Sequence, residues 1–379
     1  MIKFLFISKK LQSILFLMFI FQLAFAQNLP PENFYKHFKG NINNTINISA
    51  NIIKLQDTLY GNYYYWYFEH ESNDKHISAE IPLQGKMLSP TEFTLSEYIE
   101  TGSHFDGIFS GTNQMEGTWE NEEAGKSLSF EMIEKYPRGS MAFEIQRLKS
   151  DITLTKQTNS PKAFIDLSLL TPSCYPSPSV SDSVNRILYG AYLKDATEKT
   201  GDAILELVKA EYFEKYIEAN EKIHGDGMSF NWTKISRQNV VFNEDYLLSL
   251  EFSNFAFTGG AHSLLINKYR VVDLTDGSIV GLEKIFRENS SEKLTAILNK
   301  KLKKKHDLPA DKKLSSAGFY MDTIQPTDNF YLMRSGIGFY YNNYEIAPFS
   351  AGHNDLFIPY EDLQEILDPE GVISRIYEF

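Results

Sequence analysis

The chain of 379 residues contains a single cysteine, Cys174, between Thr171 and Pro176. A chain with one cysteine forms no internal disulfide, so hydrophobic cores have to supply its stability. Because free cysteine is among the residues most often buried, we interpret Cys174 as a small residue in a proline-bounded bend. A reactive thiol and an intermolecular bridge are the alternatives.

Motifs of several enzyme classes are missing as well. The sequence has no His-Glu-x-x-His, no Gly-x-Ser-x-Gly, no phosphate-binding loop and no cysteine pair. The segment from Ser72 to Lys75 fits Ser-x-x-Lys, but it lies in a polar turn without companion motifs. The sequence therefore predicts neither a catalytic residue nor a cofactor.

The apolar run of the N-terminus, from Ile14 to Phe21, is too short to span a bilayer. Lysines precede it, and the small residues Ala24 and Ala26 follow. This order predicts a secretory signal over residues 1–26 and a mature protein in the periplasm or outside the cell. The residue directly after the cleavage site is Gln27 and not a cysteine, so a lipid anchor is not expected, and no transmembrane segment is expected in the mature chain.

Positive charge is scarce. The net charge is −12, and it becomes −15 without the three lysines of the first 26 residues. Such a chain repels phosphate backbones, so neither nucleic acid nor an anionic membrane surface is expected as a partner. The basic run from Lys300 to Lys305 is interpreted as the solvated end of a helix, with contact to envelope phosphates as the alternative.

Short strands with alternating polarity fill residues 27–149, which we predict to form one all-β domain. The runs are spaced by 8 to 12 residues with turn residues between them, a pattern typical of an antiparallel meander that closes into a barrel or folds into a sandwich. A lipocalin-like barrel is one version. Gly107 and Gly117 fall inside strands and would permit bulges or sharp bends. The predicted strands are 46–53, 60–68, 77–83, 93–99, 104–109, 115–119 and 127–133.

One of these strands consists of aromatic residues, from Tyr63 to Phe68. Alternation places Tyr63, Tyr65 and Tyr67 on one face and the three intervening side chains on the other. One face has to line the core. The other, represented by Tyr65 or Trp66, could stack on sugar rings, or it could simply be buried.

From residue 150 onward strands and helices occur in separate groups, which predicts an α+β unit. The periodicity predicts helices from Ser181, from Thr200 or Asp202 to Glu221, from Ser291 to Lys305, and over 362–367. The predicted strands are 152–155, 164–170, 228–242, 246–257, 264–274, 330–333, 338–341 and 356–358.

Two segments are distinctive landmarks of this unit. The first, Thr258-Gly-Gly-Ala-His262, follows an aromatic strand, and the second runs from Gly338 to His353 through Pro348. With the Asp276-Gly277 hairpin and Ile358-Pro-Tyr360, they resemble the paired domains of unknown function numbered 4163 and 3298. The resemblance assigns residues 150–270 to the first domain and 271–379 to the second.

The resemblance implies a recognition role in the cell envelope. In the relatives, a lysozyme-sensing anti-sigma factor and a peptidoglycan deacetylase, the pair is an extracytoplasmic recognition or accessory unit. This chain has neither the sigma-binding segment with its retained membrane helix nor the separate catalytic domain. The implied partner is peptidoglycan-type glycan or a lysozyme-like protein.

Candidate ligand-binding residues come from both landmarks and from the aromatic strand. Two imidazoles on glycine-rich loops could also accept a metal, and His262, His353 and Asp355 form that alternative metal set. A turn whose histidine bonds to backbone is the simpler interpretation. The candidates for ligand binding are Gly259, Gly260, His262, Tyr340, Tyr344, His353, Tyr65 and Trp66.

Three functions follow from the sequence. The leading one is a non-catalytic, secreted binding protein that recognises glycan or a lysozyme-like hydrolase, whose basic surface the acidic chain would attract. The second is a metal-dependent envelope hydrolase that uses His262 and His353. The third is a structural or assembly subunit whose aromatic strands contact other proteins.

Overall fold

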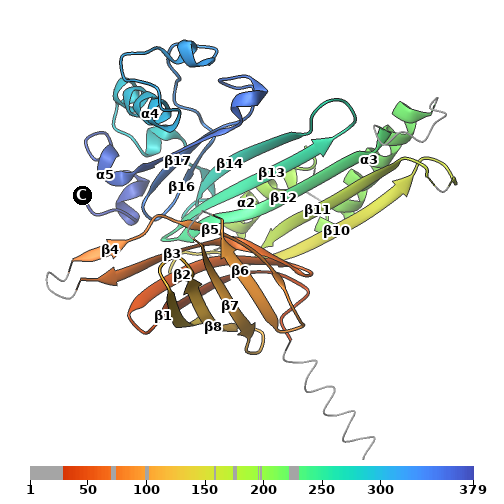
Figure 1. Cartoon of the computed structure of the whole chain (residues 1–379), viewed down its shortest axis with the longest axis horizontal. Coiled ribbons are helices and arrows are strands. Elements are labelled where there is room, and N and C mark those ends of the chain that lie inside the picture. The colour runs from red at the N-terminus through yellow and green to blue at the C-terminus, as the bar shows by residue number, and fades with distance from the viewer. Residues whose placement is uncertain are drawn as a thin grey trace, which may run out of the picture.

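The structure is a computed structural model that describes residues 29–69, 74–98, 102–157, 159–173, 177–194, 196, 199–221 and 230–379. The predicted signal segment, Ser72 and Cys174 lie outside these residues. Three β-sheets organise the described part, with the first forming one body and the other two the second body (Figure 1). No helix in these ranges has the length and apolarity needed to cross a membrane.

The first sheet is antiparallel and barrel-like. It follows the order β2-β1-β9-β8-β7-β6-β5-β3-β4, and a further pairing between β2 and β3 closes it. The barrel alternative of the predicted all-β domain is therefore confirmed. The strands are β1 (Asn33–Ile42), β2 (Ile46–Leu55), β3 (Thr58–Phe68), β4 (Lys75–Ile77), β5 (Ile81–Met87), β6 (Glu92–Glu97), β7 (Ser103–Phe109), β8 (Gln114–Asn121) and β9 (Lys126–Glu134).

Alternation along β2 explains how the barrel joins the rest of the chain. Ile48, Ala50 and Ile52 point into the barrel core, whereas Ile53 belongs to a core shared with the second sheet. The polar side chain of Ser49 lies on that outer face and is buried too. A strand buried on both faces has to satisfy its polar groups across the interface.

The second sheet has the order β10-β11-β12-β13-β14-β15. All its pairings are antiparallel except that of β11 with β12, which the chain connects through α2 and α3. Both helices contact β11 and cover one face of the sheet. The elements are β10 (Phe143–Thr153), β11 (Lys162–Pro172), α2 (Pro178–Gly190), α3 (Gly201–Asn220), β12 (Trp232–Glu244), β13 (Leu247–Phe257), β14 (Leu264–Asp273) and β15 (Ser278–Ile279).

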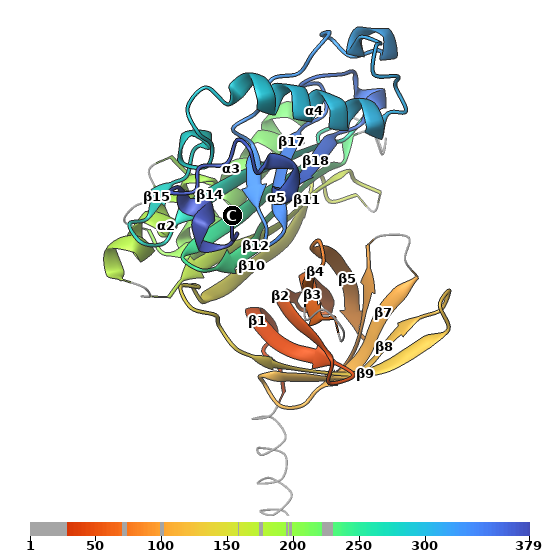
Figure 2. The same ribbon diagram turned by 90° about the vertical axis from the view of Figure 1, so that its left-hand side faces the viewer.

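The third sheet is small and lies against the other face of the second. Its strands follow the order β16-β17-β18, and α4 packs on β18 (Figure 2). Phe242 and Val271 of the second sheet share its hydrophobic core. The elements are η2 (Leu282–Lys284), α4 (Ser291–Lys305), η3 (Leu314–Ala317), β16 (Phe330–Leu332), β17 (Gly336–Tyr341), η4 (Phe349–Ala351), β18 (Asn354–Pro359), α5 (Tyr360–Leu363) and η5 (Val372–Arg375).

The α+β class of the C-terminal unit is confirmed, and α4 has the predicted bounds. β1 was not predicted because its lysines and His37 obscure the alternation, although Lys36 and His37 are buried. The predicted boundary at residues 149 and 150 falls inside β10, which pairs with β11 over its whole length. The change of sheet lies between Glu134 and Phe143.

Candidate functional site

The two landmark loops meet and form a row of aromatic rings. The ring of His262 lies on Phe349, with 4.7 Å between centroids and 20° between planes. Phe349 contacts Tyr344 at 5.6 Å. We call His262, Phe349 and Tyr344 the aromatic row. Two of its rings, those of His262 and Tyr344, are exposed to solvent.

The backbone conformation of Tyr344 is unusual for a residue with a large side chain. Its φ is 69°, in the left-handed region that bulky residues avoid. The backbone N–H of Glu345 donates to the carbonyl of Asn342, and the carboxylate of Glu345 accepts from the Asn342 backbone N–H at 2.9 Å, so a closed turn presents Tyr344. The side chain is nevertheless 54% exposed. Packing therefore does not account for a strained tyrosine at this position.

Gly259 and Gly260 shape the neighbouring loop. Their φ values are 89° and 95°, so two consecutive residues occupy the left-handed region. Only glycine adopts such a pair without steric cost. The double glycine thus turns the chain sharply and delivers His262 onto Phe349.

Tyr340 and His353 form a second stack in the same region. Their rings lie 5.2 Å apart at 17°, with Tyr340 buried beneath an exposed His353. Partial burial lowers the pKa of His353 and the charge of Lys305 lowers it further, so the ring is neutral at neutral pH. The Tyr340 hydroxyl accepts a hydrogen bond from Asn267 at 3.3 Å.

The alternative metal set is not assembled. No three His, Cys, Asp or Glu side chains that could hold a metal ion gather anywhere in the described ranges, which include His262, His353 and Asp355. Asp355 instead accepts the hydroxyl of Tyr331 at 2.9 and 2.8 Å. The two histidines stack on different aromatic partners, Phe349 and Tyr340.

Tyr65 and Trp66 do not join this region. Tyr65 packs toward the barrel core, next to Tyr63, and Trp66 lies on the outer face beside Tyr64 at 5.6 Å. Both rings are partly buried. The aromatic strand thus serves the barrel core on one face and the contact with the second sheet on the other.

A small acidic cavity of about 260 Å³ lies between the barrel and the other two sheets. Its walls include Glu80, Glu251 and Asp355, and burial raises the pKa of Asp355. The hydroxyls of Tyr269 and Tyr331 donate to Glu251 and Asp355, which satisfies two of these carboxyl groups from within the protein.

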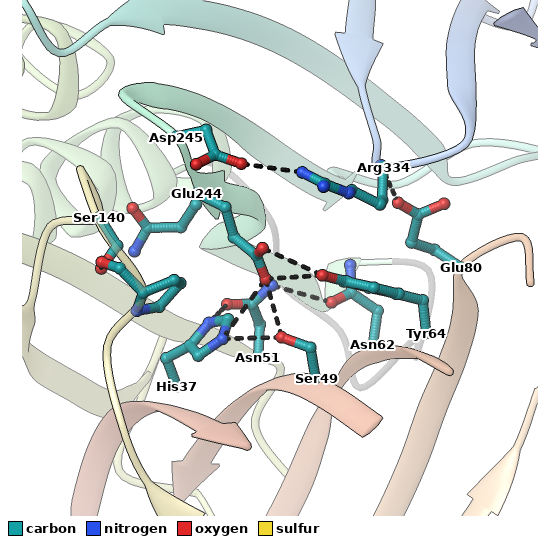
Figure 3. A network of polar contacts seen from close by, with 12 residues as sticks. His37, Ser49, Asn51, Asn62, Tyr64, Glu80, Ser140, Glu244, Asp245 and Arg334 are labelled. Carbon is teal, nitrogen blue, oxygen red and sulfur yellow. Dashed lines mark hydrogen bonds and ion pairs between the residues drawn. The ribbon is translucent and has the colours of Figure 1, made fainter. Parts of the chain in front are cut away.

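A buried polar network resembles a hydrolase triad (Figure 3). The Nε2 of His37 lies 2.9 Å from the hydroxyl of Ser49, and its Nδ1 lies 2.9 Å from Oδ1 of Asn51. The Ser49 hydroxyl also donates to Glu244 of β12 at 2.8 Å, and Tyr64 donates to the same carboxylate. These hydrogen bonds therefore connect the barrel with the second sheet.

Burial argues against nucleophilic catalysis by this serine. Ser49 is 1% exposed, and no substrate carbonyl can reach its oxygen without separation of the barrel from the second sheet. The hydroxyl has one proton, which Glu244 accepts in the observed geometry. Burial lowers the pKa of His37, while the nearby Glu244 and the hydrogen bond with Asn51 oppose that shift. The network fits an interface that joins the two bodies.

This network was not predicted from the sequence. Asn47, Ser49 and Asn51 alternate on β2, and this polar stripe within an apolar strand is a signal that could have identified it. The partner Glu244 is 195 residues from Ser49, so only the tertiary structure reveals their contact.

Comparisons with known proteins identify a domain in this region. Residues 283–361 match the family model described as protein of unknown function, DUF3298. This confirms the predicted resemblance to family 3298 for those residues, whereas the resemblance of residues 150–270 to family 4163 stays a prediction. No curated protein matches the chain.

Two solved structures are similar. A DUF3298 family member from Bacteroides fragilis is 24% identical, with a TM-score of 0.56, over 63% of this chain and 99% of its own. A DUF3298 family protein from Pseudomonas aeruginosa is 20% identical, with a TM-score of 0.42, over 60% of this chain and 95% of its own. The first likeness shows a shared fold.

Proposed function

We propose that the protein, in which residues 283–361 form a DUF3298 domain, is a non-catalytic binding protein of the cell envelope. It is exported by its N-terminal 26 residues, and it binds peptidoglycan-type glycan through the aromatic row. Exposed aromatic rings suit sugars, because their apolar faces stack on the C–H faces of the ring and a tyrosine hydroxyl supplies a polar tip.

The strained and exposed Tyr344 carries this proposal. Left-handed backbone costs a non-glycine residue about 1–2 kcal/mol, and a ligand that contacts the ring explains why a large aromatic residue occupies the turn. The stack with Phe349 and His262 holds the rings in place, which lowers the entropy lost on binding.

Substitution of Tyr344 tests the proposal. Tyr344→Gly should abolish retention on sheared, insoluble peptidoglycan in a co-sedimentation assay, since the stacking surface is lost. The same variant should be at least as stable as the parent in thermal unfolding, because glycine relaxes the backbone at a φ of 69°. This combination separates a binding defect from misfolding.

Tyr98→Ala is the matched control, because Tyr98 is a 75% exposed tyrosine of the barrel. It should leave sedimentation unchanged. Equal retention of the parent and Tyr344→Gly, or no retention of the parent, would refute the glycan proposal.

A second candidate partner is a basic lysozyme-like protein, which the acidic chain would attract. The resemblance to lysozyme-sensing domains favours the same partner. A lysozyme pull-down at low and at physiological salt distinguishes the two. If lysozyme still captures the protein at physiological salt, and captures the Tyr344→Gly variant equally well, the partner is a protein and not glycan.

A further inference from the structure

A second candidate site lies on the opposite, helix-covered face of the second sheet. There a groove of about 540 Å³ separates α2 from the strands β13, β14 and β15. Figure 2 shows β14 and β15 beside α2. The turn at Gly277 closes the groove at one side, because a Cβ there would contact Ser183 and Val180 of α2.

Three cations line this groove. Lys268 and Arg270 lie two residues apart on β14 and therefore point to the same face, and Arg186 reaches the groove from α2. Arg186 is more than 80 residues from the others along the chain, so the sequence gives no basic cluster here.

The three cations lack acidic partners among the described residues; Arg186 and Lys268 are exposed and Arg270 is partly buried. None of them forms an ion pair in the part of the chain that the structure describes, and the groove lining includes no aspartate or glutamate. One guanidinium N–H of Arg186 donates to Ser183, and one of Arg270 donates to the carbonyl of Tyr269. Their other donors have no acceptor among the described residues, although the chain has a net charge of −12.

The rest of the lining is largely apolar. Ile187 and Ala191 form the helix side, and Phe252, Ile266 and Ile279 form the sheet side. Ile279 is 52% exposed although it belongs to a strand. An apolar cleft with a few convergent polar groups is typical of a small-molecule site.

We propose that this groove binds a small amphipathic anion, with its carboxylate or phosphate on Lys268, Arg270 and Arg186 and its apolar body against Phe252, Ile266 and Ile279. Arginine presents paired donors that match the oxygens of both head groups, and hydrogen bonds between charged groups are the strong ones. The head group of the ligand is either a free carboxylate or a phosphate monoester.

Titration calorimetry of the full chain with eight-carbon probes tests the site. Octanoate and octyl phosphate should bind at one site, and the tighter of the two identifies the preferred head group. Octylamine should bind at least tenfold more weakly, because its head repels the cations. Higher salt should weaken both anions.

A double variant locates the interaction. Lys268→Gln with Arg270→Gln should weaken both anions at least tenfold, which corresponds to one charge-assisted hydrogen bond. The control, Lys300→Gln with Lys301→Gln, removes the same charge from the exposed side of α4 and should leave affinity unchanged. Thermal unfolding of both variants verifies that they fold.

The site is refuted if neither anion binds at millimolar concentration, if the double variant retains the affinity, or if octylamine binds as tightly. Tyr344→Gly should bind octanoate normally, because the aromatic row lies on separate loops. The outcome is thus independent of the glycan proposal.

Discussion

Glu80 is a carboxyl group that the fold places between the barrel and the third sheet (Figure 3). It accepts the backbone N–H of Arg334 and, at 3.0 Å, the hydroxyl of Ser335. Burial raises its pKa from 4.5 to about 7, although these hydrogen bonds oppose the shift. The charged form is therefore the disfavoured one in the folded protein.

The raised pKa predicts a pH-dependent stability. The folded protein holds this proton more tightly than the unfolded chain, so stability falls as pH rises from 4.5 to 7 and stays level above. At 1.36 kcal/mol per unit the loss is about 3 kcal/mol. Urea unfolding of Glu80→Gln should lack this slope.

His37 contributes the opposite slope, because its lowered pKa makes stability fall as pH drops below 6.5. Both proteins contain His37, so its contribution drops out when the free energy of unfolding of Glu80→Gln is subtracted from that of the parent at each pH. Parallel stability curves from pH 5 to 8 would show that Glu80 does not titrate in this range.

At the scale of elements, the barrel depends on glycines inside its strands. Gly107 of β7 lies opposite Gly117 of β8, and the register runs through both without a shift. Of the two alternatives for these glycines, bulges or sharp bends, the bulges are absent from these strand pairs. A Cβ on Gly107 would lie 2.5 Å from the backbone oxygen of Glu116 and 3.0 Å from the rings of Phe93 and Phe130. The glycine makes room for the aromatic core.

Gly107→Ala should destabilise the protein by about 1–3 kcal/mol, the usual cost of overpacking a core. Gly190→Ala is the control, because nothing lies within 4 Å of a Cβ built there at the end of α2. Chemical denaturation of both variants measures the effect. An equal stability of the two would contradict the packing argument.

The whole molecule is held together by polar contacts as well as by apolar ones. Glu244 of the second sheet accepts the hydroxyls of Ser49 and Tyr64 of the barrel, and it is 5% exposed. A buried acceptor shared by two donors couples the bodies, because separation exposes all three groups. We expect the barrel and the second sheet to unfold together.

Glu244→Ala should uncouple them. It leaves two buried hydroxyls without their acceptor, at a cost of about 3 kcal/mol. Scanning calorimetry should then resolve two transitions in place of one. Glu206→Ala on the exposed face of α3 removes the same charge and should keep a single transition. One transition in both variants would mean that apolar packing alone couples the bodies.

The sequence predicted the elements well where one face is apolar. α4 was predicted with its bounds because leucines recur at helical spacing, and most barrel strands were found from their alternation. β1 was missed, and only the end of β10 was predicted, within the strand 152–155, because charged or polar side chains interrupt both patterns. Burial between two sheets gives these polar residues partners that local sequence does not reveal.

The sequence by itself determined the α+β class, the barrel-forming strand series and the glycine turn before His262, since each depends on local periodicity or backbone freedom. Only the tertiary structure decided which candidates meet. It brought His262 to Tyr344 through Phe349, kept Tyr65 and Trp66 in the barrel away from that row, and gathered Arg186 with Lys268 and Arg270 in one groove. The reason is physical: strand order and helix packing set distances between residues that are far apart in the chain, and no local pattern encodes them.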